Sequence, residues 1–410
     1  MKLLYFVQYF PPEKASGLSL VMDMLEGFAN AGWEVDVYTP TPTRGVCAET
    51  RKEYKKKPLE VLFDGNVKIH RMPLYHEGTN MLQRTIRYSI FSLQCLLKGL
   101  FCRADMIFTG GGPPTQGIVA GLIHMLTKKK VIYNPQDLFP DSMIYSGMAS
   151  EKSIAVQIWR VFEKFSYNHA DAVITISQEM KRTILSRCKH PERVHVVRNW
   201  VNTEQIIPVE REHNRLFEEL ALPKDAFYVT YAGNLGMVQG VGVLLEAAER
   251  LKNIPNIQFA IFGNGSEEQK IRDKISGDSL YNVSLFPLQP HERISEVYSL
   301  GDMSVVCCKA GTSKAGMPSK IWSILASGTA ILASYDKGSE LDDLLRLELC
   351  GICVEPENPD ALADVIAQMA KDSVTIRAMG MNARFYALEQ CGKTENVAQY
   401  VDIMRKTLGR

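Results

Sequence analysis

Two loops in the second half of the chain combine residue types that suit the binding of an anion. Residues 233–240 (GNLGMVQG) place three glycines between an apolar run and a helical pattern, so the backbone can approach a ligand and the next helix N-terminus favours negative charge. Residues 318–320 (Pro-Ser-Lys) open another helical pattern with a hydroxyl and an ammonium group. The pair predicts a diphosphate site, although each loop alone also suits an ordinary turn or helix start.

Three loops in the first half of the chain also follow apolar runs. Residues 134–142 (NPQDLFPDS) contain two carboxylates, an amide and two prolines, which suggests a rigid catalytic or substrate-positioning loop. Gly17 lies where the first helix begins, so its amide could face a bound group. The loop 110–115 (GGGPPT) could shape an acceptor pocket or simply turn the chain.

The elements that must position these loops alternate along the whole chain. Short strand-like runs are predicted at 3–7, 35–39, 67–71, 106–110, 131–134, 172–177 and 194–198, and again at 227–233, 257–263, 283–287, 303–308, 330–334 and 351–356. Helical patterns separate most of these runs, and 360–408 is predicted to be helical throughout. Such alternation predicts βαβ units with parallel sheets, whose ligand sites lie beyond the carboxyl ends of the strands.

A polar, charged linker after Asn199 divides the strands into two series, so we predict an α/β fold with two Rossmann-like doubly wound domains facing a cleft. The predicted domains are 1–205 and 206–387, with a C-terminal helix at about 388–410 packing back on the first domain. The 410 residues carry a net charge of +1, yet residues 1–200 carry +8 and residues 201–410 carry −7. The near-neutral total argues against a nucleic-acid-binding protein.

Other features bear on the compartment. Pro11, Pro12 and Glu13 follow the first apolar run in place of a cleavage site, which argues against a signal peptide and favours a cytoplasmic protein. Cys350 and Cys353 have the spacing of a redox motif but lie in a strand-like run, which favours buried thiols. The stretch 88–101 is too short to span a membrane. It belongs to a predicted helix over about 82–102, flanked or interrupted by Arg84, Arg87, Lys98 and Arg103, that could pack on a sheet or also touch the membrane surface.

Taken in order, these segments resemble the retaining family 4 glycosyltransferases, which have the two-domain GT-B fold. The resemblance covers nearly the whole chain and rests on FANAGWEVDVYT, HVVRNWVN, YAGNLGMVQGVGVLLEAAERL, FAIFGNGSEE and PSKIWSILASGTAILAS. NPQDLFPDS and GGPPTQGIVAGL are similar to a bacterial subgroup of aminosugar (fucosamine-type) transferases from surface-polysaccharide clusters. The resemblance implies a nucleotide-sugar donor, expected to be UDP-linked, on the second domain and a lipid-linked or saccharide acceptor on the first, with no metal and no cofactor.

The resemblance also assigns residues by motif position. The donor-binding residues that it implies are Gly17, Gly233, Asn234, Leu235, Gly236, Gly263, Phe286, Leu288, Pro318, Ser319 and Lys320. The acceptor-binding residues that it implies are Gly112, Pro113, Gln136 and Asp137. Asp137 and Lys320 are the residues expected to act in catalysis, Asp137 by positioning the sugar or acceptor.

This sequence departs from the family pattern at the donor site. Many members carry an Arg and a Lys where this chain has Asn234 and Gln239, so Lys320 must supply more of the charge. The paired glutamates of the family fall at Ala315 and Ser323, and Glu292 is a speculative substitute. These departures leave open a catalytically silent partner subunit, and the architecture also leaves open a nucleotide-sugar epimerase.

Overall fold

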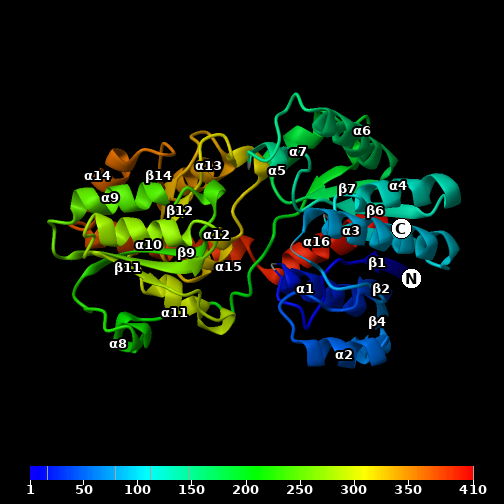
Figure 1. The fold of residues 1–410 in the computed structure, drawn as a ribbon, viewed down its shortest axis with the longest axis horizontal. Coiled ribbons are helices and arrows are strands. Elements are labelled where there is room, and N and C mark those ends of the chain that lie inside the picture. The colour runs from blue at the N-terminus through cyan, green and yellow to red at the C-terminus, as the bar shows by residue number, and fades with distance from the viewer. Residues whose placement is uncertain (16, 79, 111, 146, 410) are drawn as a thin grey trace. The chain divides into compact units, whose positions relative to one another are not determined.

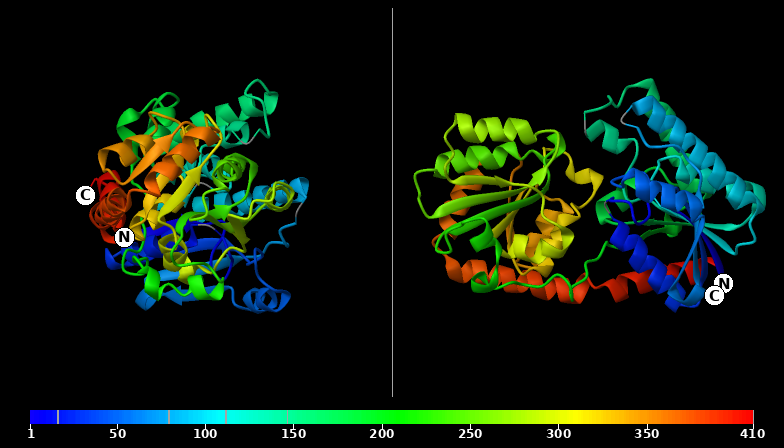
Figure 2. Two further views of the ribbon diagram at one scale, coloured as in Figure 1. Left: turned by 90° about the vertical axis from the view of Figure 1, so that its left-hand side faces the viewer. Right: turned by 60° about the horizontal axis from the view of Figure 1, so that its bottom comes forward.

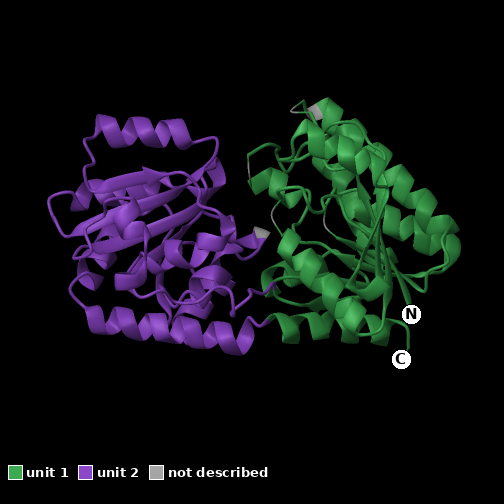
Figure 3. Cartoon of the chain, turned by 90° about the horizontal axis from the view of Figure 1, so that it is seen from below, with its two compact units in different colours: residues 1–198, 393–410 green, residues 199–392 purple. Residues whose placement is uncertain are grey.

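The structure is a computed structural model that describes residues 1–409 apart from residues 16, 79, 111 and 146. It divides into two compact units (Figure 3). Unit 1 comprises residues 1–198 and 393–410, and unit 2 comprises residues 199–392. The divisions fall at Asn199 and Lys393, whereas the sequence suggested 206 and 388.

Unit 1 is built on an eight-stranded sheet with the order β3-β4-β2-β1-β5-β6-β7-β8. Its strands are β1 (Lys2–Phe6), β2 (Glu34–Pro40), β3 (Leu59–Leu62), β4 (Val67–Met72), β5 (Met106–Gly110), β6 (Lys130–Asn134), β7 (Ala172–Thr175) and β8 (Val194–Val196). All neighbouring strands are parallel except β3, which pairs antiparallel with β4 at the edge. The parallel strands place their carboxyl ends, and the loops that follow, along one side of the sheet.

Helices cover both faces of this sheet (Figure 1). They are α1 (Leu18–Asn30), α2 (Ala48–Lys56), α3 (Met81–Phe101), α4 (Gln116–Thr127), α5 (Asp141–Tyr145), α6 (Ile154–His169), α7 (Gln178–Leu185) and α16 (Lys393–Thr407). Helix α3 packs on α4 and α4 on α6, while the C-terminal helix α16 packs on α1, as Figure 2 shows for the red and blue ends of the chain. At this contact Gly27 of α1 has no room for a side chain, because a Cβ there would lie 2.1 Å from Val397 Cγ1.

Unit 2 is built on a six-stranded parallel sheet with the order β11-β10-β9-β12-β13-β14. Its strands are β9 (Phe227–Asn234), β10 (Ile257–Asn264), β11 (Val283–Phe286), β12 (Met303–Cys307), β13 (Ala330–Ser334) and β14 (Gly351–Val354). Its helices are α8 (Leu216–Glu219), α9 (Gly242–Leu251), α10 (Glu268–Gly277), α11 (Ile294–Ser299), α12 (Lys320–Ala326), α13 (Glu340–Leu347), α14 (Pro359–Met369) and α15 (Ser373–Gln390). Buried apolar clusters lie on both faces of the sheet, as a parallel sheet requires.

The predicted fold class is confirmed: both units are α/β with doubly wound, largely parallel sheets. The sequence analysis did not single out the strand β3 or the helices α2, α5, α7, α8 and α13. Strand β3 is hard to recognise because Leu59 and Val61 are exposed at the sheet edge and the run is only four residues long. Helix α12 begins at Lys320, two residues after the predicted start at Pro318. Among the described residues, no helix is long and apolar enough to cross a membrane.

Candidate active site

The donor-site candidates of unit 2 lie along one edge of its sheet. Strands β11, β10, β9 and β12 are neighbours and parallel, so their carboxyl ends meet at that edge. Residues 235–240 follow β9, and residues 318–320 lie between β12 and the first residue of α12. Gly263 is the second-last residue of β10, and Phe286 is the last residue of β11. The structure therefore brings together candidates that are up to 87 positions apart in the sequence.

Two glycines on adjacent strands allow this edge to pack closely. Gly233 and Gly263 are paired across β9 and β10. A Cβ on Gly263 would lie 2.4 Å from the Gly233 carbonyl oxygen, and a Cβ on Gly233 would lie 2.9 Å from Lys320 Nζ. Gly233 also has a φ of +142°, which favours glycine. A larger residue at either position would displace the strand end or the lysine.

Lys320 is the most unusual charged residue at this edge. Its Nζ lies 3.7 Å from the centroid of the Tyr231 ring, a cation–π contact, and is buried. It has no hydrogen-bond partner in the described part of the chain. Burial lowers the pKa of Lys320 to about 8, although the neighbouring Cys307 and Cys308 act weakly in the opposite direction. A desolvated ammonium without an acceptor is costly to the protein alone, so the geometry suits an anionic ligand.

The loop after β9 is held by uncharged groups. Asn234 Nδ2 donates to Gln239 Oε1 at 3.1 Å, so these two residues bond to each other where many family members carry cations. Leu235 is fully buried in the core, and its backbone N–H and C=O bond to Asn264 and Glu267. Leu235 can therefore shape the loop, but its side chain faces the core. Gly236 has its amide at the N-terminal side of the 3₁₀ turn Met237–Gln239.

The remaining donor-site candidates surround this edge. Phe286 stacks on Phe262 with ring centroids 5.2 Å apart, and Leu288 is half-exposed just beyond it. Ser319 is exposed and makes no side-chain capping bond to α12, which leaves its hydroxyl available. The Pro318 carbonyl accepts a hydrogen bond from the Ile321 N–H.

The candidates of unit 1, which are the donor-site residue Gly17 and the acceptor-site residues, follow three adjacent strands. Gly17 follows β1, Gly112 and Pro113 follow β5, and Gln136 and Asp137 follow β6. Gly17 is the N-terminal cap of α1 with a φ of +78°. Gly112 is exposed and close to the β1 loop, since a Cβ there would lie 2.9 Å from Gln8 Oε1, whereas Pro113 is buried.

Gln136 is tied to the interior of unit 1. Its side-chain Nε2 donates to Asn134 Oδ1 at 2.8 Å. Asn134 is buried and donates to the Ile174 carbonyl at 2.7 Å and to the Tyr400 hydroxyl at 3.2 Å. The C-terminal helix therefore holds the start of the 135–140 loop, an arrangement between residues 266 positions apart.

Asp137 is exposed to solvent in part, yet the surrounding chain raises the pKa of its carboxyl above the ordinary value. Burial is the main cause, and the negative charge of Asp141 acts in the same direction. Hydrogen bonds from the Ser142 side chain and the Leu138 backbone oppose the rise without cancelling it. A carboxyl in such a setting is a candidate for positioning a hydroxyl or exchanging a proton.

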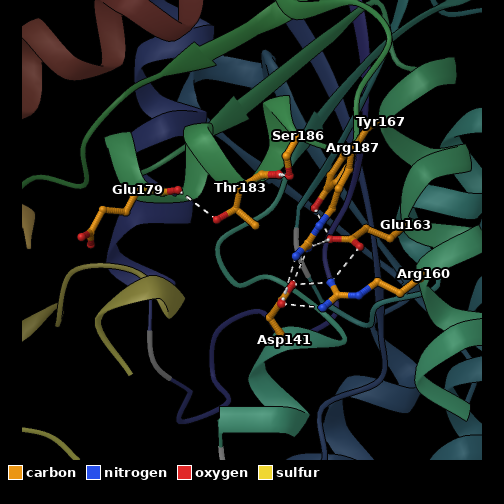
Figure 4. A network of polar contacts seen from close by, with 8 residues as sticks. All are labelled: Asp141, Arg160, Glu163, Tyr167, Glu179, Thr183, Ser186 and Arg187. Carbon is orange, nitrogen blue, oxygen red and sulfur yellow. Dashed lines mark hydrogen bonds and ion pairs between the residues drawn. The ribbon is translucent and has the colours of Figure 1, made fainter. Parts of the chain in front are cut away.

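A buried cluster of four charges lies just beyond Asp137 (Figure 4). Asp141 accepts paired hydrogen bonds from Arg160, both at 2.7 Å, and a further pair from Arg187. Glu163 accepts from Arg160 at 3.1 Å, from Arg187 at 2.7 Å and from the Tyr167 hydroxyl at 3.1 Å. Burial opposes ionisation of Asp141, but the two guanidinium groups hold its pKa below the ordinary value.

Sequence reasoning missed several of these residues. Tyr400, Arg160, Glu163 and Arg187 belong to no loop or motif that the sequence singled out. Asn134 and Asp141 lie in the 134–142 loop and Tyr231 opens the segment YAGNLG, but their contacts with distant residues leave no local signal. Cys350 and Cys353 are buried free thiols, as predicted. Within the described residues, no group of three or more His, Cys, Asp or Glu side chains could hold a metal ion.

Comparisons with known proteins agree with this architecture. Residues 19–205 match the family model "Glycosyltransferase Family 4" and residues 212–385 match "Glycosyl transferases group 1". The two models together account for both units. The chain belongs to the family 4 glycosyltransferases. It is 27% identical over 417 residues to the putative colanic acid biosynthesis glycosyl transferase WcaI of Escherichia coli, covering 99% of this chain and all of that protein.

Solved structures show the same GT-B fold as this glycosyltransferase. Sucrose-phosphate synthase from Thermosynechococcus elongatus superimposes with a TM-score of 0.79 at 18% identity, covering 100% of this chain and 99% of that one. Anabaena Alr3699/HepE in complex with UDP superimposes with a TM-score of 0.74 at 13% identity, covering 99% and 100%. At these identities the likeness establishes the fold of this glycosyltransferase and leaves its substrates to be determined.

Proposed function

We propose that this glycosyltransferase moves a hexose or aminosugar from a UDP-linked donor to a lipid-linked or saccharide acceptor, with retention of configuration. The reaction would serve the assembly of a surface polysaccharide such as a capsule, O-antigen or exopolysaccharide. The name of WcaI, a colanic acid biosynthesis glycosyl transferase, supports the pathway class. The complex of HepE with UDP supports a uridine nucleotide.

The observation that carries the proposal is the buried, unpaired ammonium of Lys320. It lies beside Gly233 and over Tyr231, at the edge of the sheet where the loops after β9 and β12 meet. A nucleoside diphosphate would supply the missing acceptor. As the sugar departs, negative charge grows on the diphosphate, and a cation already fixed in a water-poor site stabilises that charge without reorganising.

The rest of unit 2 would hold the donor by its backbone and by packing. The amides of Gly233, Gly236 and the following turn would face the diphosphate, while Gly263, Phe286 and Leu288 would border the base. Pro318 and Ser319 would contact phosphate or sugar. Asn234 is already bonded to Gln239, so it would contribute a neutral hydrogen bond.

In unit 1, Asp137 and Gln136 would position the sugar or the acceptor hydroxyl, with Gly112 and Pro113 shaping the adjacent backbone, and the amide of Gly17 would contact the donor phosphate. The departing diphosphate oxygen would help to take the proton of the acceptor hydroxyl. We propose that no metal ion takes part, because Lys320 and the amide groups occupy the role of a cation in this site. Transfer that is unchanged by EDTA is expected, and a loss of transfer that Mg²⁺ or Mn²⁺ restores would contradict this part of the proposal.

Nucleotide binding tests the donor assignment. We expect UDP to raise the melting temperature of the purified chain more than ADP or GDP does, and a panel of UDP-sugars with a membrane extract as acceptor to yield a glycosylated lipid by mass spectrometry. Failure of every nucleoside diphosphate to stabilise the chain would overturn the proposal.

A catalytically silent partner subunit is the second candidate function. It is favoured by Ala315 and Ser323 at the positions of the family glutamates, and Glu292 is exposed in the 3₁₀ turn His291–Arg293. Tight UDP binding without sugar transfer or donor hydrolysis, in the presence of the full set of donors, would favour this alternative.

We also propose that the chain lies at the inner face of the plasma membrane through helices of unit 1. Several large apolar side chains of α3 and α6 are exposed, including Phe101 at 82% and Ile154 at 80%. The others on these two helices are Leu82, Ile86, Ile90, Leu93, Leu97, Ile158, Val161 and Phe162. Exposed cations lie on the same helices or beside them, at Lys98, Arg103, Lys152 and Lys164. Apolar groups among cations suit an anionic bilayer surface.

Arg87 is not part of that surface, contrary to what the sequence pattern suggested. It is 2% exposed and donates inward to the Tyr75 carbonyl and the Thr43 hydroxyl. Vesicle flotation tests the remaining surface. Leu97→Ser with Phe101→Ser should abolish flotation with phosphatidylglycerol vesicles, whereas the matched control Leu347→Ser with Leu349→Ser in unit 2 should not. Equal flotation of both variants would contradict the membrane assignment.

A further inference from the structure

The four-charge cluster of unit 1 joins the helix that follows the Asp137 loop to helix α6 and to the segment after α7. Asp141 is the first residue of α5, Arg160 and Glu163 lie on α6, and Arg187 follows α7. Asp141 accepts four hydrogen bonds from the two guanidinium groups, so both of its oxygens are engaged. The end of the loop is thereby fixed to α6 and to the segment after α7.

The other end of the loop is fixed as well. Asn134 is anchored to β7 through the Ile174 carbonyl and to α16 through Tyr400. Between these anchors, Leu138 is buried and its carbonyl accepts the Ser142 N–H at 2.8 Å. Only six residues separate Asn134 from Asp141, so the position of Asp137 depends on both anchors.

The charges of the cluster cancel, and its paired hydrogen bonds fix the direction of the Asp141 side chain. Two carboxylates face two guanidinium groups. The carboxylates are nearly inaccessible, with Asp141 at 5% and Glu163 at 2% exposure, and the two arginine side chains are 16% exposed. Paired hydrogen bonds from a planar guanidinium fix direction as well as distance. A pure packing role would be served as well by apolar side chains of similar volume.

We propose that Asp141, held by Arg160 and Arg187, is a positioning residue that sets the placement and ionisation of Asp137 for transfer. This inference rests on the proposed function, in which Asp137 meets the sugar or acceptor. Asp141 acts on Asp137 through the shared loop and through its negative charge, which favours the protonated form of the Asp137 carboxyl. Asp141 on α5 is the titratable group that raises the pKa of Asp137, and the charge of Asp137 in turn raises the pKa of the buried Tyr133 on β6.

The test compares two nearly isosteric variants of the same cluster. Asp141→Asn and Glu163→Gln each remove one buried negative charge, but only Asp141 is on the Asp137 loop. For Asp141→Asn we expect turnover to fall about tenfold or more, since small misplacements of reacting groups carry such costs. The KM for the nucleotide-sugar should remain unchanged, because the donor site belongs to unit 2. The acid limb of the pH–turnover profile should move to lower pH, because the neighbouring negative charge has gone.

Glu163→Gln should lose stability as Asp141→Asn does while keeping turnover and the acid limb close to those of the unchanged chain. If the two variants behave alike in turnover and pH profile, the cluster is structural only and the inference is wrong. Arg187→Lys provides a second route if Asp141→Asn does not fold: it keeps the charge, loses the paired geometry, and should lower turnover without moving the acid limb. Asp137→Asn separates the role of Asp137 from that of Asp141, since unchanged transfer in that variant would refute the role of Asp137 itself.

Discussion

Buried charge is handled in opposite ways in the two units. In unit 1, Asp141, Glu163, Arg160 and Arg187 form a closed set in which every charge has a partner of opposite sign. In unit 2, the ammonium group of Lys320 is buried beside an aromatic ring, with no hydrogen-bond partner among the described side chains and backbone groups. A compensated cluster of buried charges fixes the segments that it joins, whereas an uncompensated buried charge suits the binding of an anionic ligand. An unpaired buried charge is thus a better guide to a binding site than a large ionic network.

The largest effect is expected where a compensated charge loses its partner. Arg187→Met should lower the free energy of unfolding by about 3–5 kcal/mol, because Asp141 and Glu163 would remain buried with an excess negative charge. Urea denaturation at neutral pH measures this. A loss below about 1 kcal/mol would show that the cluster is hydrated and that the contrast between the units is weaker than the structure indicates.

Removal of the uncompensated charge of Lys320 should not lower the free energy of unfolding. Lys320→Met keeps the length of the side chain and removes a costly buried charge, so the unfolding free energy of the nucleotide-free chain should stay the same or rise. UDP binding should weaken about 10- to 100-fold, in line with about 1.5–3 kcal/mol for a charge-assisted contact. Calorimetric titration measures the Kd, and Lys371→Met, an exposed lysine of unit 2, is the matched control. An unchanged Kd for Lys320→Met would refute the assignment.

The low pKa of Lys320 predicts how the stability of the chain and its affinity for UDP change with pH. The pKa of Lys320 is about 8 in the folded chain and 10.5 in the unfolded one, so between these values the unfolded state binds more protons. The nucleotide-free chain should therefore gain stability from this residue as the pH rises from about 8 to 10.5. UDP affinity should fall over the same range, because the ammonium is lost. Parallel titrations of Lys320→Met should show neither trend, and a matching trend in that variant would assign it to another group.

The smallest effect is expected at an exposed pair. Arg346 donates to Asp343 at 2.7 Å on α13, and both side chains are more than half exposed. Arg346→Gln should change the free energy of unfolding by no more than about 0.5 kcal/mol, because solvent screens such pairs. A loss comparable to that of Arg187→Met would mean that burial does not govern the cost of breaking an ion pair in this protein.

Much of the fold could be predicted because its signals are local. Strands β1, β5, β9, β10 and β13 are continuous apolar runs that end in Gly, Asn or polar residues, and such runs need no knowledge of their neighbours. Edge strand β3 escaped prediction because its apolar side chains face solvent. The inward direction of the Arg87 side chain was not predicted for a related reason. Its position in the helix is consistent with an inward or an outward side chain, and it points inward because the loops carrying Thr43 and Tyr75 supply its hydrogen-bond acceptors.

The sequence by itself determined the order of strands and helices, the division into two α/β units, the family, and the loops on which Gly233, Asp137 and Lys320 lie. These follow from periodicity, glycine and proline placement, and motif order, which are properties of neighbouring residues. The tertiary structure decided that the Lys320 ammonium is buried against Tyr231 with no hydrogen-bond partner among the described residues, that Asp141 meets Arg160 and Arg187, and that Asn134 meets Tyr400. Such contacts depend on strand order and helix packing, which join residues tens to hundreds of positions apart, and no local pattern encodes them.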